Sequence, residues 1–392
     1  MRAGVYCTSW EYAGGGEKLL AVTAGRLAVA GYDVCLYGPT PPPVERLQDV
    51  LSVRLDGCRV SAARSGLEPF LRVVGRVSPR AERVIRGRTE LRFARGLDLF
   101  VYITGEIPPA CPAPRGILFI QFPYNPEEAI RVDAGGRPLR AAGREKLARL
   151  RSWSSPVCPS QFVREWVRER WRIPAAVVYP PSETSACQAL EKTRTILTVG
   201  RFYAAGNNKK HAVMVRAFRE LCDEGLSGWE LLLAGGTHPR DDHQAYLREV
   251  RALADGYPVR VLTDLRFDEV VPLYGGASLY WHATGAGEDA NKQPERFEQF
   301  GMTVVEAMAA GAVPLVFGGG GPAEIVRDGV DGFLWRDATE LKRRTLELIS
   351  RPDLLASCRA SATVRSSEFS REKFESAIDA VIAGDGTGRA EA

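Results

Sequence analysis

The sequence lacks the long apolar runs of a membrane-spanning protein. No stretch of about 18 uncharged apolar residues occurs anywhere in the 392 residues, so no transmembrane helix is predicted. The N-terminus, from Met1 to Cys7, reads as a first strand. It lacks the apolar run and the small-residue cleavage site of a signal peptide. These absences predict a cytoplasmic protein.

The sequence also has few of the residues that build disulfide frameworks or metal clusters. Its eight cysteines lie far apart, with no Cys-x-x-Cys pair, and it has four histidines. A disulfide scaffold and a metal cluster are therefore not expected, and unpaired cysteines fit a reducing cytoplasm. No Asp-x-Asp motif stands at the end of an expected strand. We expect no metal site and no cofactor.

No internal repeat with a period of roughly 20 to 50 residues is present, which argues against a solenoid. The chain is longer than a single core usually supports, so two domains are expected. Short apolar runs alternate with helical patterns, which predicts βαβ units and mainly parallel sheets. A helix is expected over residues 17–30. The expected strands are residues 4–9, 33–37, 98–103, 117–122, 195–199, 229–234, 259–263, 278–282 and 313–317.

A polar, proline-bearing stretch from Tyr179 to Lys192 separates the two halves of the chain. It predicts a domain boundary, which we place after residue 188. Residues 1–188 would form one domain and residues 189–369 the other. A helical pattern over 370–383 is expected to pack back on the first domain, and 384–392 to be a disordered tail.

Charge is distributed unevenly along the chain, although the formal net charge is only +4. Through residue 185, 27 Lys and Arg stand against 18 Asp and Glu, a net +9, which leaves −5 for the rest. The arginines concentrate in residues 80–95 and 131–151. Solvated helix faces would explain them. The functional interpretation is a surface for an anionic acceptor, or peripheral contact with a membrane that carries one. No aromatic interleaving accompanies the arginines, so no nucleic acid partner is expected.

The segment from Glu298 to Gly311 carries the strongest chemical signal: Glu-Gln-Phe-Gly-Met-Thr-Val-Val-Glu-Ala-Met-Ala-Ala-Gly. Gly301 permits close backbone approach, and a helix from Thr303 onward would offer free N–H groups and its dipole to an anion. Glu298, in the loop, and Glu306, one turn into the helix, would then flank a phosphate-sized site. A structural alternative stays open, because Thr303-x-x-Glu306 is also the pattern of a capping box.

This segment closely resembles the Glu-x7-Glu signature of retaining GT-B glycosyltransferases of the glycosyl transferases group 1, or family 4, type. The resemblance implies an α/β protein of GT-B fold, with two Rossmann-like doubly wound domains facing across a cleft. It implies that Glu298 contacts the donor sugar ring and that Glu306 holds the ribose hydroxyls of the nucleotide. Main-chain amides around four residues would bind the donor sugar and diphosphate: Phe300, Gly301, Met302 and Thr303.

Two further segments match this family in the expected order. Arg201 follows an expected strand in Val-Gly-Arg-Phe, and Lys209 precedes an expected helix in Asn-Asn-Lys-Lys-His. In the family this arginine and lysine grip the donor diphosphate, and Lys209 fits the register better than Lys210. Two fixed cations would stabilise the charge that develops as the nucleotide leaves. A basic loop after a strand is common, however, and would also serve as plain surface.

Other segments fit the family less specifically. Gly15 and Gly16 belong to a glycine loop that would approach donor phosphate or acceptor; it lacks the Gly-x-Gly-x-x-Gly spacing of a dinucleotide site, and a tight βα turn is the alternative. His282 ends an expected strand and would bind the donor, unless its role is purely structural. Gln121 stands where many relatives carry a histidine. Glutamine cannot take a proton but can orient a sugar.

The resemblance implies transfer of a hexosyl-type sugar from a UDP- or GDP-sugar to an acceptor hydroxyl on a glycan, glycolipid or small-molecule aglycone. The α configuration would be retained, and no metal would be needed because Arg201 and Lys209 supply the positive charge. Residues 1–188 would recognise the acceptor and 189–369 the donor. Two alternatives stay open: a sugar-nucleotide epimerase of GT-B fold, and a non-catalytic sugar-nucleotide-binding protein, which Gln121 would suit.

Overall fold

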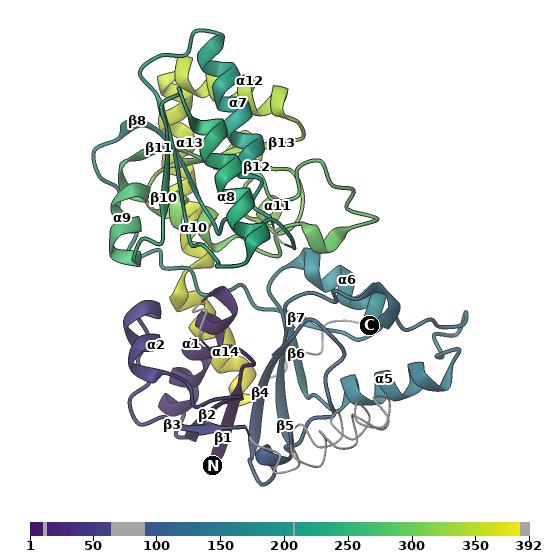
Figure 1. The fold of residues 1–392 in the computed structure, drawn as a ribbon. Helices are drawn as coiled ribbons and strands as arrows, with labels where there is room; N and C mark the ends of the chain where they lie inside the picture. The colour runs from purple at the N-terminus through teal and green to yellow at the C-terminus, as the bar shows by residue number, and fades with distance from the viewer. Residues whose placement is uncertain (11–13, 64–90, 207, 385–392) are drawn as a thin grey trace. The chain divides into compact units, whose positions relative to one another are not determined.

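The computed structural model describes residues 1–10, 14–63, 91–206 and 208–384 (Figure 1). They form two compact units, the described residues of Met1–Tyr179 with Phe374–Ala392, and Pro180–Lys373. The division falls at the start of the proline-bearing stretch, earlier than the boundary expected after residue 188. The expected tail beyond Gly384 and most of the arginine run at 80–95 lie outside the described residues.

The first unit is built on a seven-stranded parallel sheet with the strand order β3-β2-β1-β4-β5-β6-β7. Its strands are β1 (Arg2–Tyr6), β2 (Asp33–Gly38), β3 (Arg59–Ala62), β4 (Leu99–Thr104), β5 (Arg115–Ile120), β6 (Ser155–Cys158) and β7 (Ala176–Val177). The order reverses between β1 and β4. Open sheets of this kind bind ligands at such a switch point, beyond the carboxyl ends of the strands.

Helices cover both faces of this sheet, with α1, α2 and α14 on one side and α5 and α6 on the other (Figure 1). Alternate strand residues serve the two cores, because successive side chains point to opposite faces: Val5 packs with α1, and Tyr6 lies in the other cluster. Phe374 and Ile378 of α14 are buried in the same core as Val5. The helices are α1 (Gly15–Val29), α2 (Val44–Leu51), α5 (Ala141–Arg151), α6 (Gln161–Trp171) and α14 (Arg371–Ala383).

The second unit repeats this plan with a six-stranded parallel sheet in the order β10-β9-β8-β11-β12-β13. Its strands are β8 (Thr193–Val199), β9 (Glu230–Gly235), β10 (Val259–Thr263), β11 (Ala277–His282), β12 (Val313–Phe317) and β13 (Phe333–Trp335). The switch point lies between β8 and β11. Each unit taken by itself is a doubly wound Rossmann-like sheet, as the family resemblance implied, and its strands run parallel, as the alternating pattern predicted.

Some helices of the second unit begin where a local side chain accepts a hydrogen bond from a free backbone N–H group. At the start of α12, for example, the Asp337 carboxylate accepts a hydrogen bond from the N–H of Glu340 at 2.8 Å. The helices are α7 (His211–Asp223), α8 (Asp241–Ala254), α9 (Phe267–Gly276), α10 (Met302–Ala309), α11 (Pro322–Ile325), α12 (Ala338–Ser350) and α13 (Pro352–Ser366). Short 3-10 turns are η1 (Arg92–Ala94), η2 (Pro126–Glu128), η3 (Pro294–Arg296) and η4 (Ser367–Phe369). None of the described helices is long and apolar enough to cross a membrane.

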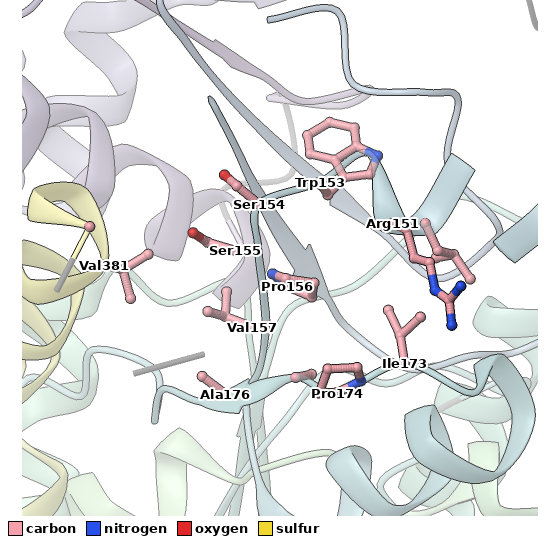
Figure 2. A pocket seen from close by; sticks show the side chains of 13 residues that line it. Arg151, Trp153, Ser154, Ser155, Pro156, Val157, Ile173, Pro174, Ala176 and Val381 are labelled. Atoms are coloured by element: carbon pink, nitrogen blue, oxygen red, sulfur yellow. The ribbon is translucent and has the colours of Figure 1, made fainter. Parts of the chain in front are cut away.

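A cavity of about 330 Å³ lies in the first unit, where β6 and β7 begin. Figure 2 shows Trp153, Pro156, Pro174 and Val381 around it, with Arg151 nearby. This is the amino-terminal edge of the parallel strands. Ligands of doubly wound sheets bind at the opposite, carboxyl-terminal edge, so this cavity does not lie where such a sheet binds its ligand.

Candidate functional site at the second switch point

The donor residues predicted in the second unit gather near the carboxyl ends of β8 and β11, the two strands that flank the switch point of its sheet. Arg201 and Lys209 lie in the segment that joins β8 to α7, and His282 is the last residue of β11. Gly200 lets the lysine stem cross the strand end, because a Cβ there would lie 2.6 Å from Cγ of Lys209.

Lys209, His282 and Glu298 form one contiguous cluster. The Nζ atom of Lys209 pairs with Oε2 of Glu298, and Nε2 of His282 lies 3.2 Å from the same oxygen. Thr284 adds its hydroxyl, 3.4 Å from Oε2 of Glu298 and 3.2 Å from Nε2 of His282. The exposed fractions are 16% for the Lys209 side chain, 12% for Glu298 and 4% for His282. A largely buried carboxylate is thus held by a cation, an imidazole and a hydroxyl.

Electrostatics keep this carboxylate ionised. Burial by itself would raise the pKa of Glu298, but the charge of Lys209 and the hydrogen bond from His282 outweigh it and hold that pKa well below its usual range. Burial lowers the pKa of His282, and Lys209 lowers it further, against the opposing effect of Glu298. A neutral His282 therefore donates its Nε2–H to Glu298. Within the described residues, its buried Nδ1 has no hydrogen-bond partner.

Arg201 lies apart from the Lys209 pair. Its side chain is exposed, and the guanidinium carbon lies 4.6 Å from the centroid of the Tyr203 ring, in cation–π geometry. That ring also stacks on His243, at 4.5 Å with the planes only 4° apart, and meets His238 edge-on at 5.7 Å. Among the described residues no carboxylate pairs with Arg201, so its charge is available to an anionic ligand.

The N-terminus of α10 is shaped by glycines rather than by a side-chain cap. Gly301 is the N-cap residue, with φ of 109°, and the helix starts at Met302. Thr303 therefore lies inside the helix, and the capping-box alternative for Thr303 and Glu306 is wrong. Gly321 donates its N–H to the carbonyl of Glu298 at 2.8 Å, and a Cβ on Gly321 would lie 2.4 Å from Cα of Phe300. The loop after β12 thus supports the backbone that leads into the helix.

Glu306 is buried on α10 and accepts a hydrogen bond from the hydroxyl of Tyr274, at the end of α9, at 3.1 Å. Lys192 holds the far ends of both helices: its Nζ donates to the carbonyls of Gly275, at 2.7 Å, and Ala310, at 2.5 Å. Burial lowers the pKa of Lys192 to about 8.

The phenylalanine of the motif has a structural role, because Phe300 is buried and its ring packs against Phe369.

Directly after the two lysines, His211 begins α7 and is fully buried. Its ring stacks on Phe202 at 4.3 Å. Within the described residues, neither ring nitrogen makes a hydrogen bond of normal geometry, although the nearby backbone of Gly200 raises the pKa of the ring slightly. Burial, reinforced by the charge of Lys209, lowers the pKa of His211 from 6.5 to about 3. The base of the site therefore contains an imidazole that is neutral near pH 7.

The site residues predicted in the first unit lie at the carboxyl-terminal edge of its sheet. Gly15 and Gly16 open α1 after β1, and Gln121 follows β5 with an exposed side chain. A Cβ on Gly16 would lie 2.8 Å from Nε2 of Gln121, so the glycine makes room for the amide. Glu17 accepts from the N–H of Gly14 at 3.0 Å and caps the helix.

Three residues of the site were missed by sequence reasoning: Thr284, Tyr274 and Glu288. The first two carry no local signal, since a buried threonine and tyrosine are ordinary core residues. Glu288 could have been suspected as an acid between β11 and Glu298. Among the described residues no group of three or more His, Cys, Asp or Glu side chains is placed to hold a metal ion.

The family model that matches this chain covers part of the second unit. Residues 193–351 match the family described as Glycosyl transferases group 1. The human protein named GDP-Man:Man(3)GlcNAc(2)-PP-Dol alpha-1,2-mannosyltransferase is 27% identical over 219 residues, 51% of this chain and 42% of that protein. Glycogen synthase of Xanthomonas oryzae pv. oryzae is 34% identical over 146 residues, 36% of this chain and 26% of that protein. The chain thus spans less than half the length of these curated relatives.

Solved structures resemble nearly the whole chain. Sucrose-phosphate synthase of Thermosynechococcus elongatus matches with a TM-score of 0.68 at 15% identity, covering 98% of this chain and 99% of that one. HepE of Anabaena, solved in complex with UDP-glucose, matches with a TM-score of 0.66 at 15% identity, covering 98% and 100%. At this identity the likeness shows the fold, which is GT-B with two Rossmann-like domains.

Proposed function

We propose that this protein is a glycosyltransferase that moves a hexosyl group from a UDP- or GDP-sugar to an acceptor hydroxyl with retention of the α configuration. The observation that carries the proposal is the Lys209–Glu298–His282 cluster, because it lies at the switch point where doubly wound sheets bind ligands. It also lies inside the segment that matches the Glycosyl transferases group 1 family. Together with the GT-B fold, this supports a transferase that uses a nucleotide sugar.

Each cation has a task toward the donor diphosphate in this proposal. Lys209 would leave Glu298 and bind the diphosphate, and Arg201 would approach it with its exposed guanidinium. The main-chain N–H groups of Gly301, Met302 and Thr303 would add the free donors and dipole of α10. Negative charge on the leaving nucleotide grows toward the transition state, so these groups would bind it most tightly there.

The acidic groups would hold the sugars. Glu298, ionised at neutral pH, would accept hydrogen bonds from hydroxyls of the donor hexose, with His282 beside it. Glu306, already paired with Tyr274, would accept from the ribose hydroxyls. In a front-face reaction the bond between the anomeric carbon and the departing phosphate breaks, and the acceptor oxygen bonds to that carbon on the same face. The departing phosphate takes the proton of the attacking hydroxyl. Gln121 would orient a sugar and need not carry a proton.

The first unit would recognise the acceptor. Its exposed arginines around α5, such as Arg140 and Arg144, would suit an anionic acceptor or an anionic membrane that presents one. We also propose that the reaction needs no metal, because Lys209 and Arg201 supply positive charge where a divalent cation would otherwise act. The proposed setting is the cytoplasm.

The test is nucleotide release from a panel of UDP- and GDP-sugars, with the anomeric configuration of the product read by NMR. Lys209→Ala should lower kcat by about 10²–10³, the usual cost of one preorganised electrostatic partner, and weaken donor affinity less. Glu298→Gln should also depress turnover. The matched control is Lys292→Ala, which removes a lysine that is 81% exposed. Tight donor binding without any turnover would instead identify a non-catalytic binding protein, and interconversion of free sugar nucleotides an epimerase.

A further inference from the structure

The loop between β11 and α10, residues 283–301, carries Glu298 and is anchored at several places. Thr284 is fully buried and contacts both His282 and Glu298. The ring of Phe297 is buried against glycines: a Cβ on Gly285 would lie 2.7 Å from it, and a Cβ on Gly319 would lie equally close. These contacts fix both ends of the loop. Its middle is fixed by charge.

Glu288 is the charged anchor in the middle of the loop. Its Oε1 lies 2.6 Å from Nζ of Lys210, and its Oε2 lies 3.0 Å from Nη1 of Arg296. Its side chain is only 10% exposed. Burial alone would raise the pKa of Glu288, but Lys210 and Arg296 together lower it below its ordinary value. Both carboxylate oxygens are engaged by cations, so Glu288 bridges protein groups.

Two adjacent lysines therefore hold two glutamates of the same loop. Lys210 has φ of 57°, an unusual left-handed conformation, and its N–H donates to Oδ1 of Asn208 at 2.6 Å. With this turn at the start of α7, Lys209 reaches Glu298 while Lys210 reaches Glu288. A left-handed conformation at a non-glycine residue costs free energy and persists only where surrounding contacts hold it.

The Lys209–Glu298 pair and the Lys210–Glu288 pair have different roles in the proposed function. Lys209 and Glu298 must separate when a donor binds, because one would take the diphosphate and the other the hexose hydroxyls. Opening a largely buried ion pair removes one connection between the loop and α7. Lys210 and Glu288 have no such competing partner in the proposal, so their connection would remain closed.

We propose that Glu288 is a positioning residue. Through its ion pairs with Lys210 and Arg296, it holds the loop that carries Glu298 against the start of α7. Lys209 and Glu298 can then separate and bind the donor while their side chains stay aligned. This inference rests on the proposed function. In this inference the ion pairs of Glu288 with Lys210 and Arg296 stay closed during the reaction. Lys210 therefore has a positioning role, whereas Lys209 binds the donor.

The test compares Glu288→Gln and Lys210→Met with Asp289→Asn, which neutralises the neighbouring exposed acid of the same loop. Loss of alignment by about 1 Å would lower kcat by up to roughly 100-fold with a smaller change in donor affinity. The double variant should be no slower than the slower single variant, because both substitutions break the same contact between Lys210 and Glu288. Asp289→Asn should leave kcat unchanged. Lys210→Met tests the same contact from its other side if Glu288→Gln does not fold.

The outcomes separate this inference from the proposed function. If the unaltered protein turns over no sugar nucleotide, both are overturned. If it is active but Glu288→Gln and Lys210→Met match Asp289→Asn in kcat, the proposed function stands and the positioning role is overturned. A lower melting temperature with unchanged kcat would likewise show that Glu288 only stabilises the fold.

Discussion

We predict that His211 makes the second unit less stable in acid, and that its replacement by phenylalanine removes this contribution. The ring is fully buried at the start of α7, and its pKa is lowered from 6.5 to about 3, first by burial and then by the charge of Lys209. Between pH 6.5 and pH 3, His211 is protonated in the unfolded chain but stays neutral in the folded protein. Stability due to this residue is therefore complete above pH 6.5 and is lost as the pH falls toward 3.

The size of the effect follows from the shift. Each pKa unit corresponds to about 1.36 kcal/mol, so at pH 5, some 1.5 units below the ordinary histidine value, His211 costs about 2 kcal/mol of unfolding free energy. His211→Phe keeps an aromatic ring against Phe202 and places no titrating group in the core. We expect the variant to avoid that loss of about 2 kcal/mol between pH 7 and pH 5.

The assay is urea unfolding of both proteins at pH 7 and pH 5, followed by tryptophan fluorescence. Every other titrating group is shared, so the difference between the two pH-dependent losses isolates His211, provided that the m-values agree. Equal losses of stability in the two proteins would refute the reasoning. That result would mean that the folded protein accommodates a charged His211, beside Lys209, as readily as the unfolded chain does.

Three further results are expected. Glu306→Gln should weaken UDP or GDP binding in calorimetry, because a ribose acceptor loses its charge; an unchanged affinity with a lower melting temperature would assign Glu306 to structure alone. Activity should survive excess EDTA, since Arg201 and Lys209 supply the positive charge, and loss restored by Mg²⁺ or Mn²⁺ would contradict this. Binding to anionic vesicles, if the basic first unit directs it, should weaken steeply with salt, because exposed charges are screened beyond about 8 Å at physiological ionic strength. Absence of vesicle binding at low salt would favour a soluble acceptor.

Much of the architecture could be read from periodicity and spacing. Buried parallel strands are short apolar runs between helical patterns, and two of them were predicted with their observed ends, Val259–Thr263 and Val313–Phe317. The Glu-x7-Glu spacing placed Glu298 in a loop and Glu306 on a helix without knowledge of any contact. The helix start was less well predicted: Gly301, rather than Thr303, is the N-cap residue, because glycine tolerates the positive φ that this turn requires.

The amino-acid sequence by itself determined the periodicities, the glycines and the order of charged residues along the chain, because these are local properties of neighbouring side chains. Which charges meet was decided only by the tertiary structure. Lys209 and Lys210 are adjacent, yet one pairs with Glu298 and the other with Glu288, because the left-handed turn at Lys210 sends their side chains to different partners. The perturbed pKa values of Glu298 and His211 likewise come from burial, which exists only once β8, β11 and α7 have packed together.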